Sequence, residues 1–149
     1  MTGNSDREMI EQIKELKARY FRFMDCKQWH ELESLFVPDV VIDMRHGGAS
    51  YDEAMLYDGG ARRYIETVAP ILQDMITVHH GHMPEITLTS PTSAAGIWAM
   101  EDKLWAPEGH PIGWRHLHGY GHYHETYERS DDRWRIRTIR LSRLHIEVR

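Results

Sequence analysis

The chain has 149 residues, of which 41% are hydrophobic and 28% are charged, and its formal net charge is -5. This length fits a single domain with one core, spanning residues 1–149, and the composition excludes a disordered chain. The negative charge gives no field that attracts phosphates, so no nucleic-acid partner is expected. No apolar run approaches the roughly 20 residues of a membrane span, and no secretory signal begins the chain. We therefore expect a cytoplasmic protein with no membrane partner.

The positions of cysteine and arginine indicate the compartment of the protein and the role of its basic segment. Cys26 is the only cysteine, which excludes an intrachain disulfide and favours a reducing compartment. The C-terminal segment is locally basic, but its arginines recur mostly two or three positions apart in a strand-like run. This spacing favours a solvated or interfacial face over a nucleic-acid patch. The residues concerned are Arg133, Arg135, Arg137, Arg140, Arg143 and Arg149.

The first half of the chain predicts helices. A capping-box spacing, Ser5-x-x-Glu8, precedes apolar residues at three- and four-residue steps, which predicts a helix from about Asp6 to Asp25. A second, shorter helix is expected from Trp29 to Phe36, with Pro38 as its stop. A β-branched run at 40–44 predicts a strand, residues 46–50 a loop, and residues from about 58 to 72 a third helix that contains Pro70.

The second half predicts four strands, at 77–89, 94–106, 113–128 and 133–147, separated by turn-forming residues. Helices followed by an antiparallel meander indicate an α+β fold, in which a curved sheet folds over the helices. Such a sheet encloses a pocket between its concave face and the helices, where buried polar groups converge.

His79 is the first candidate for chemistry. It follows Ile76 and Val78 at the beginning of a strand, where its alternation partners are Gly81 and Met83. Histidine exchanges protons near neutral pH, so it is suited to act as a general base. The alternative is a core or interface histidine bonded to a backbone carbonyl.

Asp102 is the second candidate. It shares strand parity with Trp98, Met100 and Leu104, which places a carboxylate among bulky apolar neighbours, while Glu101 and Lys103 take the opposite face. A buried carboxylate needs a partner, and a histidine on a neighbouring strand is the most economical one. An edge or interface acid bound to arginine is the alternative.

Tyr20 and Asp25 lie on the last turns of the first predicted helix. A tyrosine can donate a hydrogen bond to a developing oxyanion, and an aspartate can hold the Nδ1 hydrogen of a histidine to fix its tautomer. Alternatively, the tyrosine packs in the core and the aspartate caps the turn before Lys27.

The other histidines include three pairs two positions apart on strands: His80 and His82, His116 and His118, and His122 and His124. This spacing can chelate zinc, iron or manganese, but no cysteine cluster or helical HExxH motif accompanies it, and Glu125 has the opposite parity from the last pair. We therefore expect no metal at these histidines and place them on an outer sheet face or a subunit contact.

Four segments together resemble the SnoaL-like branch of the NTF2-like superfamily, whose lyases include bile acid 7α-dehydratase, scytalone dehydratase and lindane dehydrochlorinase. The segments run from Ile13 to Trp29, from Val78 to Thr87, through Glu101-Asp102, and from Tyr123 to Trp134. The resemblance implies an NTF2-like cone, with N-terminal helices packed on a curved, mainly antiparallel sheet that encloses a deep pocket. It also implies assembly as a trimer or dimer and elimination chemistry without a cofactor.

The resemblance also implies roles for individual residues. His79 matches the general base of these lyases, Asp25 the carboxylate paired with it, Tyr20 a pocket tyrosine, and Asp102 an acidic residue that follows the histidine by twenty-three positions in both sequences. Arg143 falls near a pocket arginine, and Tyr51 or Tyr57 is expected to supply a second phenol that binds substrate. Apart from the resemblance, Trp98 favours an apolar lining that binds substrate, and simple core packing is its alternative.

The sequence thus predicts a cofactor-independent, dehydratase-like lyase that acts on a hydrophobic cyclic small molecule, with His79 as general base. The same machinery could isomerise or cyclise its substrate. Two alternatives from other classes stay open. One is a non-catalytic ligand-binding or assembly subunit, in which Asp25 and His79 lie too far apart to hydrogen-bond, and the other is a metal-dependent enzyme.

Overall fold

The computed structural model describes residues 2–149 of the chain. Its helices are α1 (Thr2–Asp25), α2 (Trp29–Glu33) and α3 (Arg62–Leu72), with one short 3-10 turn at Glu53–Met55. Its strands are β1 (Phe36–Asp43), β2 (Leu56–Tyr57), β3 (Ile76–Ser90), β4 (Ser93–Trp105), β5 (His116–Ser130) and β6 (Arg133–Val148).

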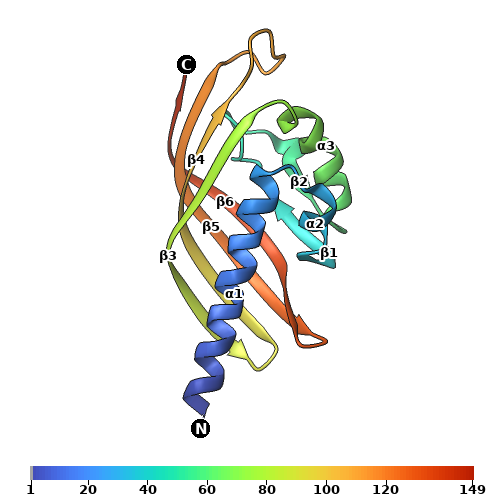
Figure 1. Cartoon of the computed structure of the whole chain (residues 1–149), viewed down its shortest axis with the longest axis vertical. Helices are drawn as coiled ribbons and strands as arrows, with labels where there is room; N and C mark the ends of the chain where they lie inside the picture. The colour runs from blue at the N-terminus through green and yellow to red at the C-terminus, as the bar shows by residue number, and fades with distance from the viewer. Residues whose placement is uncertain (1) are drawn as a thin grey trace.

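The strands form one curved sheet in the order β2-β1-β6-β5-β4-β3. The strands β3 to β6 make an antiparallel meander, β2 pairs antiparallel with β1, and β1 runs parallel to β6. The three helices lie on the concave side of the sheet (Figure 1). The predicted α+β architecture, with helices packed on a mainly antiparallel sheet, is confirmed.

The apolar stripe of α1 meets the inner face of the sheet as its spacing predicts. Ile13, Leu16, Tyr20 and Met24 are each at most 3% exposed, so this stripe is fully removed from water. Packing of this face positions the C-terminal end of α1 beside the start of β3, which brings Asp25 to the sheet.

Two helix predictions need correction at their ends. The first helix begins at Thr2, so Ser5 lies inside α1 and does not cap it. The second helix ends early, because Phe36 begins β1 and pairs with Ile136 of β6, while Pro38 lies inside the strand. The β1–β6 register shifts between Phe36 and Val41, and such an irregularity tolerates a proline that cannot donate to the ladder.

The third helix also starts later than predicted. Gly59 and Gly60 have φ angles of 95° and 121°, a conformation that glycine adopts freely and that no α-helix contains, so α3 begins at Arg62. Pro70 stays inside α3, which continues to Leu72.

Strand β3 contains an irregularity that the strict alternation does not anticipate. The pairing with β4 shifts between His82 and Glu85, and Met83 has a φ angle of 30° and is 93% exposed. Met83 is therefore not an inward partner of His79 and Gly81, because the bulge inserts one extra residue and reverses the facing of the strand beyond it.

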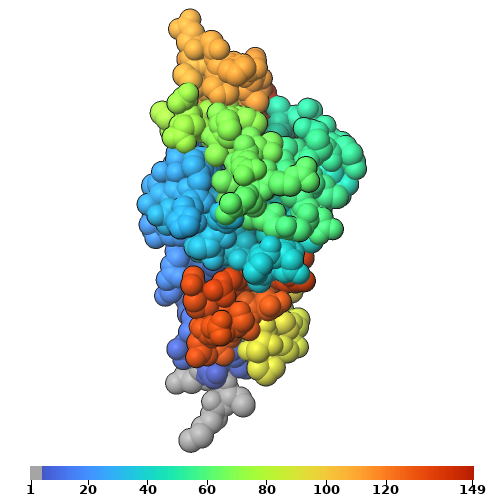
Figure 2. Space-filling model, turned by 90° about the vertical axis from the view of Figure 1, so that its right-hand side faces the viewer, coloured from blue at the N-terminus to red at the C-terminus, as the bar shows by residue number. Residues whose placement is uncertain are grey.

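Turns at the two ends of the meander lie far apart. The β3–β4 and β5–β6 turns lie toward the N-terminus of α1, and the loop between β4 and β5 projects at the opposite end, beyond α3 (Figure 2). His110 of that loop contacts the Ile71 carbonyl of α3 through Nε2 at 3.1 Å. In residues 2–149 no helix is both long enough and apolar enough to cross a membrane.

Candidate active site

A cavity of about 390 Å³ lies between the inner face of the sheet and the helices α1 and α3. The loop 44–55 and the loop 106–115 complete its wall. Most of the lining is apolar, and the polar side chains in it converge from α1, α3, β3, β4 and β5. These polar residues are Tyr20, Tyr64, His79, Asp102 and Tyr123, with Ser50 and Asp52 in the loop.

His79 and Asp25 are directly hydrogen-bonded. Nδ1 of His79 lies 2.6 Å from Oδ1 of Asp25, and the backbone N–H of His79 donates to Oδ2 at 2.9 Å. A carboxylate can only accept, so Nδ1 carries the hydrogen and Nε2 keeps its lone pair. The His79 side chain is 10% exposed, which leaves this basic nitrogen inside the cavity wall.

Asp25 is held by a short chain of donors. The hydroxyl of Thr77 donates to Oδ1 of Asp25 at 2.9 Å, and Nζ of Lys27 donates to that hydroxyl at 2.7 Å. Burial alone would raise the pKa of Asp25, but the hydrogen bonds and charge of His79 and the hydroxyl of Thr77 outweigh burial and hold the pKa below its usual value. Asp25 is therefore ionised at neutral pH, where it accepts the hydrogen bond from the imidazole.

Asp102 faces His79 from the neighbouring strand. The two residues are direct cross-strand partners of β3 and β4, and Oδ2 of Asp102 lies 4.0 Å from Nε2 of His79. The two carboxylates thus bracket the imidazole, with Asp25 at Nδ1 and Asp102 near Nε2. This geometry gives the orienting contact to Asp25, because 4.0 Å is too long for a hydrogen bond from Asp102 to the imidazole.

Arg143 of β6 neutralises Asp102 in a bidentate pair. Its Nη1 and Nη2 donate to the two carboxylate oxygens at 2.7 and 2.9 Å, and both side chains are at most 7% exposed. Gly119 of β5 stands directly opposite Asp102, and its missing side chain leaves the space in which the pair meets.

The same guanidinium reaches the loop over the cavity. Nε of Arg143 donates to the carbonyl of His46 at 3.1 Å, and Nη2 donates to the carbonyl of Gly47 at 2.8 Å. Arg143 therefore ties the loop to Asp102, and its nitrogens are already engaged by protein acceptors.

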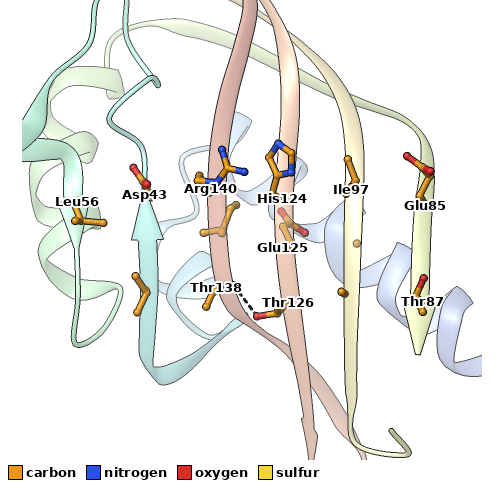
Figure 3. A pocket seen from close by; sticks show the side chains of 14 residues that line it. Asp43, Leu56, Glu85, Thr87, Ile97, His124, Glu125, Thr126, Thr138 and Arg140 are labelled. Atoms are coloured by element: carbon orange, nitrogen blue, oxygen red, sulfur yellow. Dashed lines mark hydrogen bonds between the residues drawn. The ribbon is translucent and has the colours of Figure 1, made fainter. Parts of the chain in front are cut away.

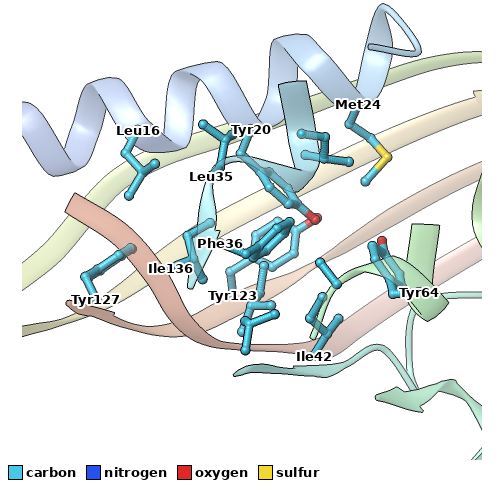
Figure 4. Packing of buried hydrophobic residues seen from close by; sticks show 14 of the residues in the cluster. Leu16, Tyr20, Met24, Leu35, Phe36, Ile42, Tyr64, Tyr123, Tyr127 and Ile136 are labelled. Atoms are coloured by element: carbon cyan, nitrogen blue, oxygen red, sulfur yellow. The ribbon is translucent and has the colours of Figure 1, made fainter. Parts of the chain in front are cut away.

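Three phenols form the polar part of the remaining wall. Figure 4 shows the hydroxyl of Tyr20 directed toward Tyr64, with the ring of Tyr123 beside it. Burial is the main cause that raises the pKa of each phenol, well above the usual value for Tyr20 and Tyr123. The phenols are thus neutral hydrogen-bond donors throughout the physiological pH range.

Several residues expected at the site lie elsewhere. Tyr51 is 52% exposed and bonds Glu53, while Tyr57 is buried and donates to the sulfur of Met55. Trp98 donates from Nε1 to the hydroxyl of Tyr127 at 2.9 Å, away from the cavity. The structure thus brings together His79 and Asp25 with the remaining predicted residues, which are Asp102, Tyr20 and Arg143.

Two phenols to which the sequence pattern assigns no role reach the cavity. Tyr123 lies on β5 at an inward position whose parity is visible in the sequence, but nothing in that pattern separates a cavity tyrosine from a core one. Tyr64 lies on the predicted third helix, and only the packing of α3 against the sheet turns it toward Tyr20.

The outer face of the sheet carries the spaced histidines. His80, His82 and His118 surround Glu101, which lies between them on β4, with nitrogen-to-oxygen distances of 3.8, 3.6 and 3.1 Å. Glu101 lies on a different strand from all three histidines, so their spacing along the sequence does not predict this contact. Across the described residues, no group of three or more histidine, cysteine or acidic side chains is arranged to hold a metal ion.

A groove on the same outer face crosses the sheet from β2 to β3, as Figure 3 shows. His124 and Arg140 lie at its centre, and Asp43 and Glu85 lie toward its two ends. The groove lies on the far side of the sheet from the cavity, so it shares no side chain with the His79 site.

The fold, the cavity and its polar residues define an NTF2-like protein with a buried imidazole–carboxylate pair. Residues 5–140 match the family model of the SnoaL-like domain, and the chain belongs to this family. The matched residues contain nearly all of α1, the whole of α2 and α3, and the strands as far as the middle of β6.

Individual relatives agree with the family. The chain is 26% identical over 136 residues to the probable cyclase FGR4 of Gibberella zeae, with 89% of each sequence covered. Its fold is similar to a candidate scytalone dehydratase from Novosphingobium aromaticivorans, with a TM-score of 0.81, 19% identity, and coverage of 99% and 91% of the two chains. It is also similar to a type 2 hexachlorocyclohexane dehydrochlorinase, with a TM-score of 0.77, 18% identity, and coverage of 97% and 90%.

Proposed function

We propose that this protein is a cofactor-independent lyase of the dehydratase type, with His79 as the general base. The contact that carries the proposal is the hydrogen bond from Nδ1 of His79 to Asp25, which leaves a basic Nε2 in an apolar cavity. A non-catalytic subunit has no need of this pair, and its members would be expected to lie apart.

The proposed reaction uses the residues in sequence. Nε2 of His79 removes a proton from a carbon next to a carbonyl, and the phenol of Tyr20 donates a hydrogen bond to the enolate oxygen that forms. The electron pair then forms the carbon–carbon double bond as the β-hydroxyl leaves, taking the proton back from Nε2 as water. Asp25 stabilises the imidazolium between these two steps through its hydrogen bond to Nδ1.

The proposed substrate is a neutral, hydrophobic, cyclic hydroxy-ketone. A cavity of about 390 Å³ with a mostly apolar lining favours a small ring system. The carboxylates of Asp52 and Asp102 line the cavity. The guanidinium of Arg143 is engaged by Asp102 and the loop carbonyls, so an anionic substrate would meet no unengaged cation there.

A cyclase or isomerase is the second candidate, and the similarity to a probable cyclase favours it. The same base could return its proton to another carbon or trigger ring closure from the enolate. Release of water from the substrate, which leaves an enone, distinguishes the lyase from the isomerase and the cyclase.

We also propose that the protein assembles as a homo-oligomer, a trimer or a dimer, as sequence resemblance suggests. Sedimentation equilibrium would measure the mass in solution, and a monomer at all concentrations would contradict this part of the proposal.

Two activities test the function. Deuterium exchange into 2-tetralone, a bicyclic ketone without a leaving group, reports proton abstraction alone, and enone absorbance from a panel of cyclic β-hydroxy ketones reports elimination. We expect His79→Gln to lower both rates by about 10²–10⁴-fold, the usual contribution of a general base. Tyr51→Phe is the matched control, because this tyrosine lies outside the cavity.

Equal rates in His79→Gln and the wild type would contradict the mechanism. Exchange without elimination would favour the isomerase or cyclase, and a wild type that neither exchanges nor eliminates would favour a binding role.

A further inference from the structure

Lys17 is a fully buried cation that the proposed reaction does not use. It lies on the inner stripe of α1, one position beyond Leu16, and its side chain is 0% exposed. Its Nζ donates to Oε1 of Glu125 on β5, whose side chain is also 0% exposed. The second oxygen of Glu125 accepts from the hydroxyl of Tyr127.

The ammonium group lies in a cage of aromatic rings. Nζ of Lys17 is 3.7 Å from the ring centre of Tyr123, 3.9 Å from that of Tyr20 and 4.8 Å from that of Phe21. Tyr20 and Tyr123 meet edge to face, with 6.0 Å between their centres. The two rings nearest the cation therefore belong to two of the phenols that line the cavity.

A buried ion pair at this position needs a reason beyond stability. Well-packed apolar residues of similar volume often stabilise a core as well as a buried pair does. A cation over an aromatic face, by contrast, attracts the ring electrons and stabilises negative charge that develops on the phenol oxygen. It also fixes the position of both rings at once.

We propose that Lys17 is a positioning residue of the active site, which holds Tyr20 and Tyr123 in place and makes their hydroxyls stronger hydrogen-bond donors toward a developing oxyanion. Glu125 is its counter-ion, fixed in turn by Tyr127. This role rests on the proposed function, because the phenols are the groups through which Lys17 acts.

The protonation of Lys17 gives the proposal a measurable signature. Burial lowers the pKa of Lys17 to about 8, against the opposing effect of Glu125. The cation is therefore present at neutral pH and absent well above pH 8. The ionisable groups that face it are Glu125, Tyr123 and Tyr127 from β5 and Tyr20 from α1 itself.

The first experiment needs no substrate. Protein labelled with ¹³C at the ζ carbon of tyrosine is titrated by NMR, with signals assigned by Tyr20→Phe and Tyr123→Phe. We expect the Tyr20 and Tyr123 signals to move together with a midpoint near pH 8, the pKa of Lys17, while the exposed Tyr51 does not move with them. The titration is repeated in His79→Gln to remove any contribution of the imidazole.

Variants complete the test. In Lys17→Arg the cation persists, so the midpoint near pH 8 is lost but the neutral-pH positions and the exchange activity are kept. In Lys17→Met/Glu125→Gln both charges are removed together. We expect the double variant to exchange deuterium into tetralone with a kcat about 10-fold below that of the wild type and a nearly unchanged KM, a loss within the range of a cation–π contact.

Two results would overturn the role of Lys17: tyrosine signals that stay fixed through pH 8 in the wild type, or a folded double variant with wild-type kcat. If the double variant fails to fold, the wild-type titration and Lys17→Arg still decide. A wild type without exchange activity would instead count against the proposed function, which the substrate-free titration does not require.

Discussion

Replacing Gly119 by alanine tests whether the Asp102–Arg143 pair needs the space that this glycine leaves. A Cβ on Gly119 would lie 2.5 Å from Oδ1 of Asp102 and also against Nη1 of Arg143. Both contacts are far shorter than van der Waals distance, and the atoms belong to a buried ion pair between β4 and β6. Neither side chain can withdraw without losing its bidentate geometry.

The expected loss in the free energy of unfolding has two contributions. Overpacking of a core by one methyl group costs about 1–3 kcal/mol, and separating a buried ion pair costs about 3–5 kcal/mol when it is complete. Partial displacement of the pair places Gly119→Ala at about 3 kcal/mol. For a domain of this size the melting temperature should fall by roughly 6–12 °C.

Thermal unfolding followed by circular dichroism measures the effect. Gly48→Ala is the matched control, because a Cβ there would lie 3.9 Å from the carbonyl oxygen of Ser50, in ordinary contact. A Gly119→Ala protein that melts within about 2 °C of the wild type, less than the shift of 1 kcal/mol, would refute the reasoning.

Three further predictions concern charged groups in the core and the site. Asp25→Asn should lower the rate of deuterium exchange into tetralone by up to about 10⁴-fold, because an amide can donate to Nδ1 and favour the wrong tautomer; a loss below threefold would contradict the orienting role. The folded pKa of Asp25 lies below its unfolded value, so its contribution to stability is complete above about pH 4 and is lost as the pH falls through the folded pKa. Urea unfolding between pH 2 and 5 should show a weaker pH dependence in Asp25→Asn, and parallel curves would count against it. Lys17→Met alone leaves Glu125 buried without its counter-ion and should cost about 3–5 kcal/mol, whereas Lys17→Met/Glu125→Gln should cost much less; equal losses in the two variants would contradict the pairing.

Strand alternation alone predicts the facing of the two central residues of the site. His79 and Asp102 fall on inward positions of β3 and β4, and their direct pairing is the cross-strand contact that a buried carboxylate requires. Helical periodicity places Asp25 only at a helix end, so the choice between Asp25 and Asp102 as the orienting group depends on the packing of α1 against β3.

Other features could not be read from one strand or helix at a time. Lys17 stands among apolar positions of α1, and its partner Glu125 is 108 positions away, so no local pattern associates them. The loop carbonyls of His46 and Gly47 carry no side-chain signal, yet Arg143 binds both. Glu101 meets three histidines only because the strands beside it bring them there.

The extra residue at Met83 divides β3 into two segments with separate reading frames. Before it, inward positions are odd-numbered and include His79; after it, they are even-numbered, and Ile86 and Leu88 pack against the core. Deleting one residue at this bulge would join the two frames into one unbroken ladder, with His79 and Leu88 both still facing inward. Adding or deleting one residue between His79 and Leu88 while the bulge is kept would instead turn one segment over, sending either the imidazole or the core side chains into solvent. The bulge is therefore what allows β3 to lose one residue without reversing the facing of either segment.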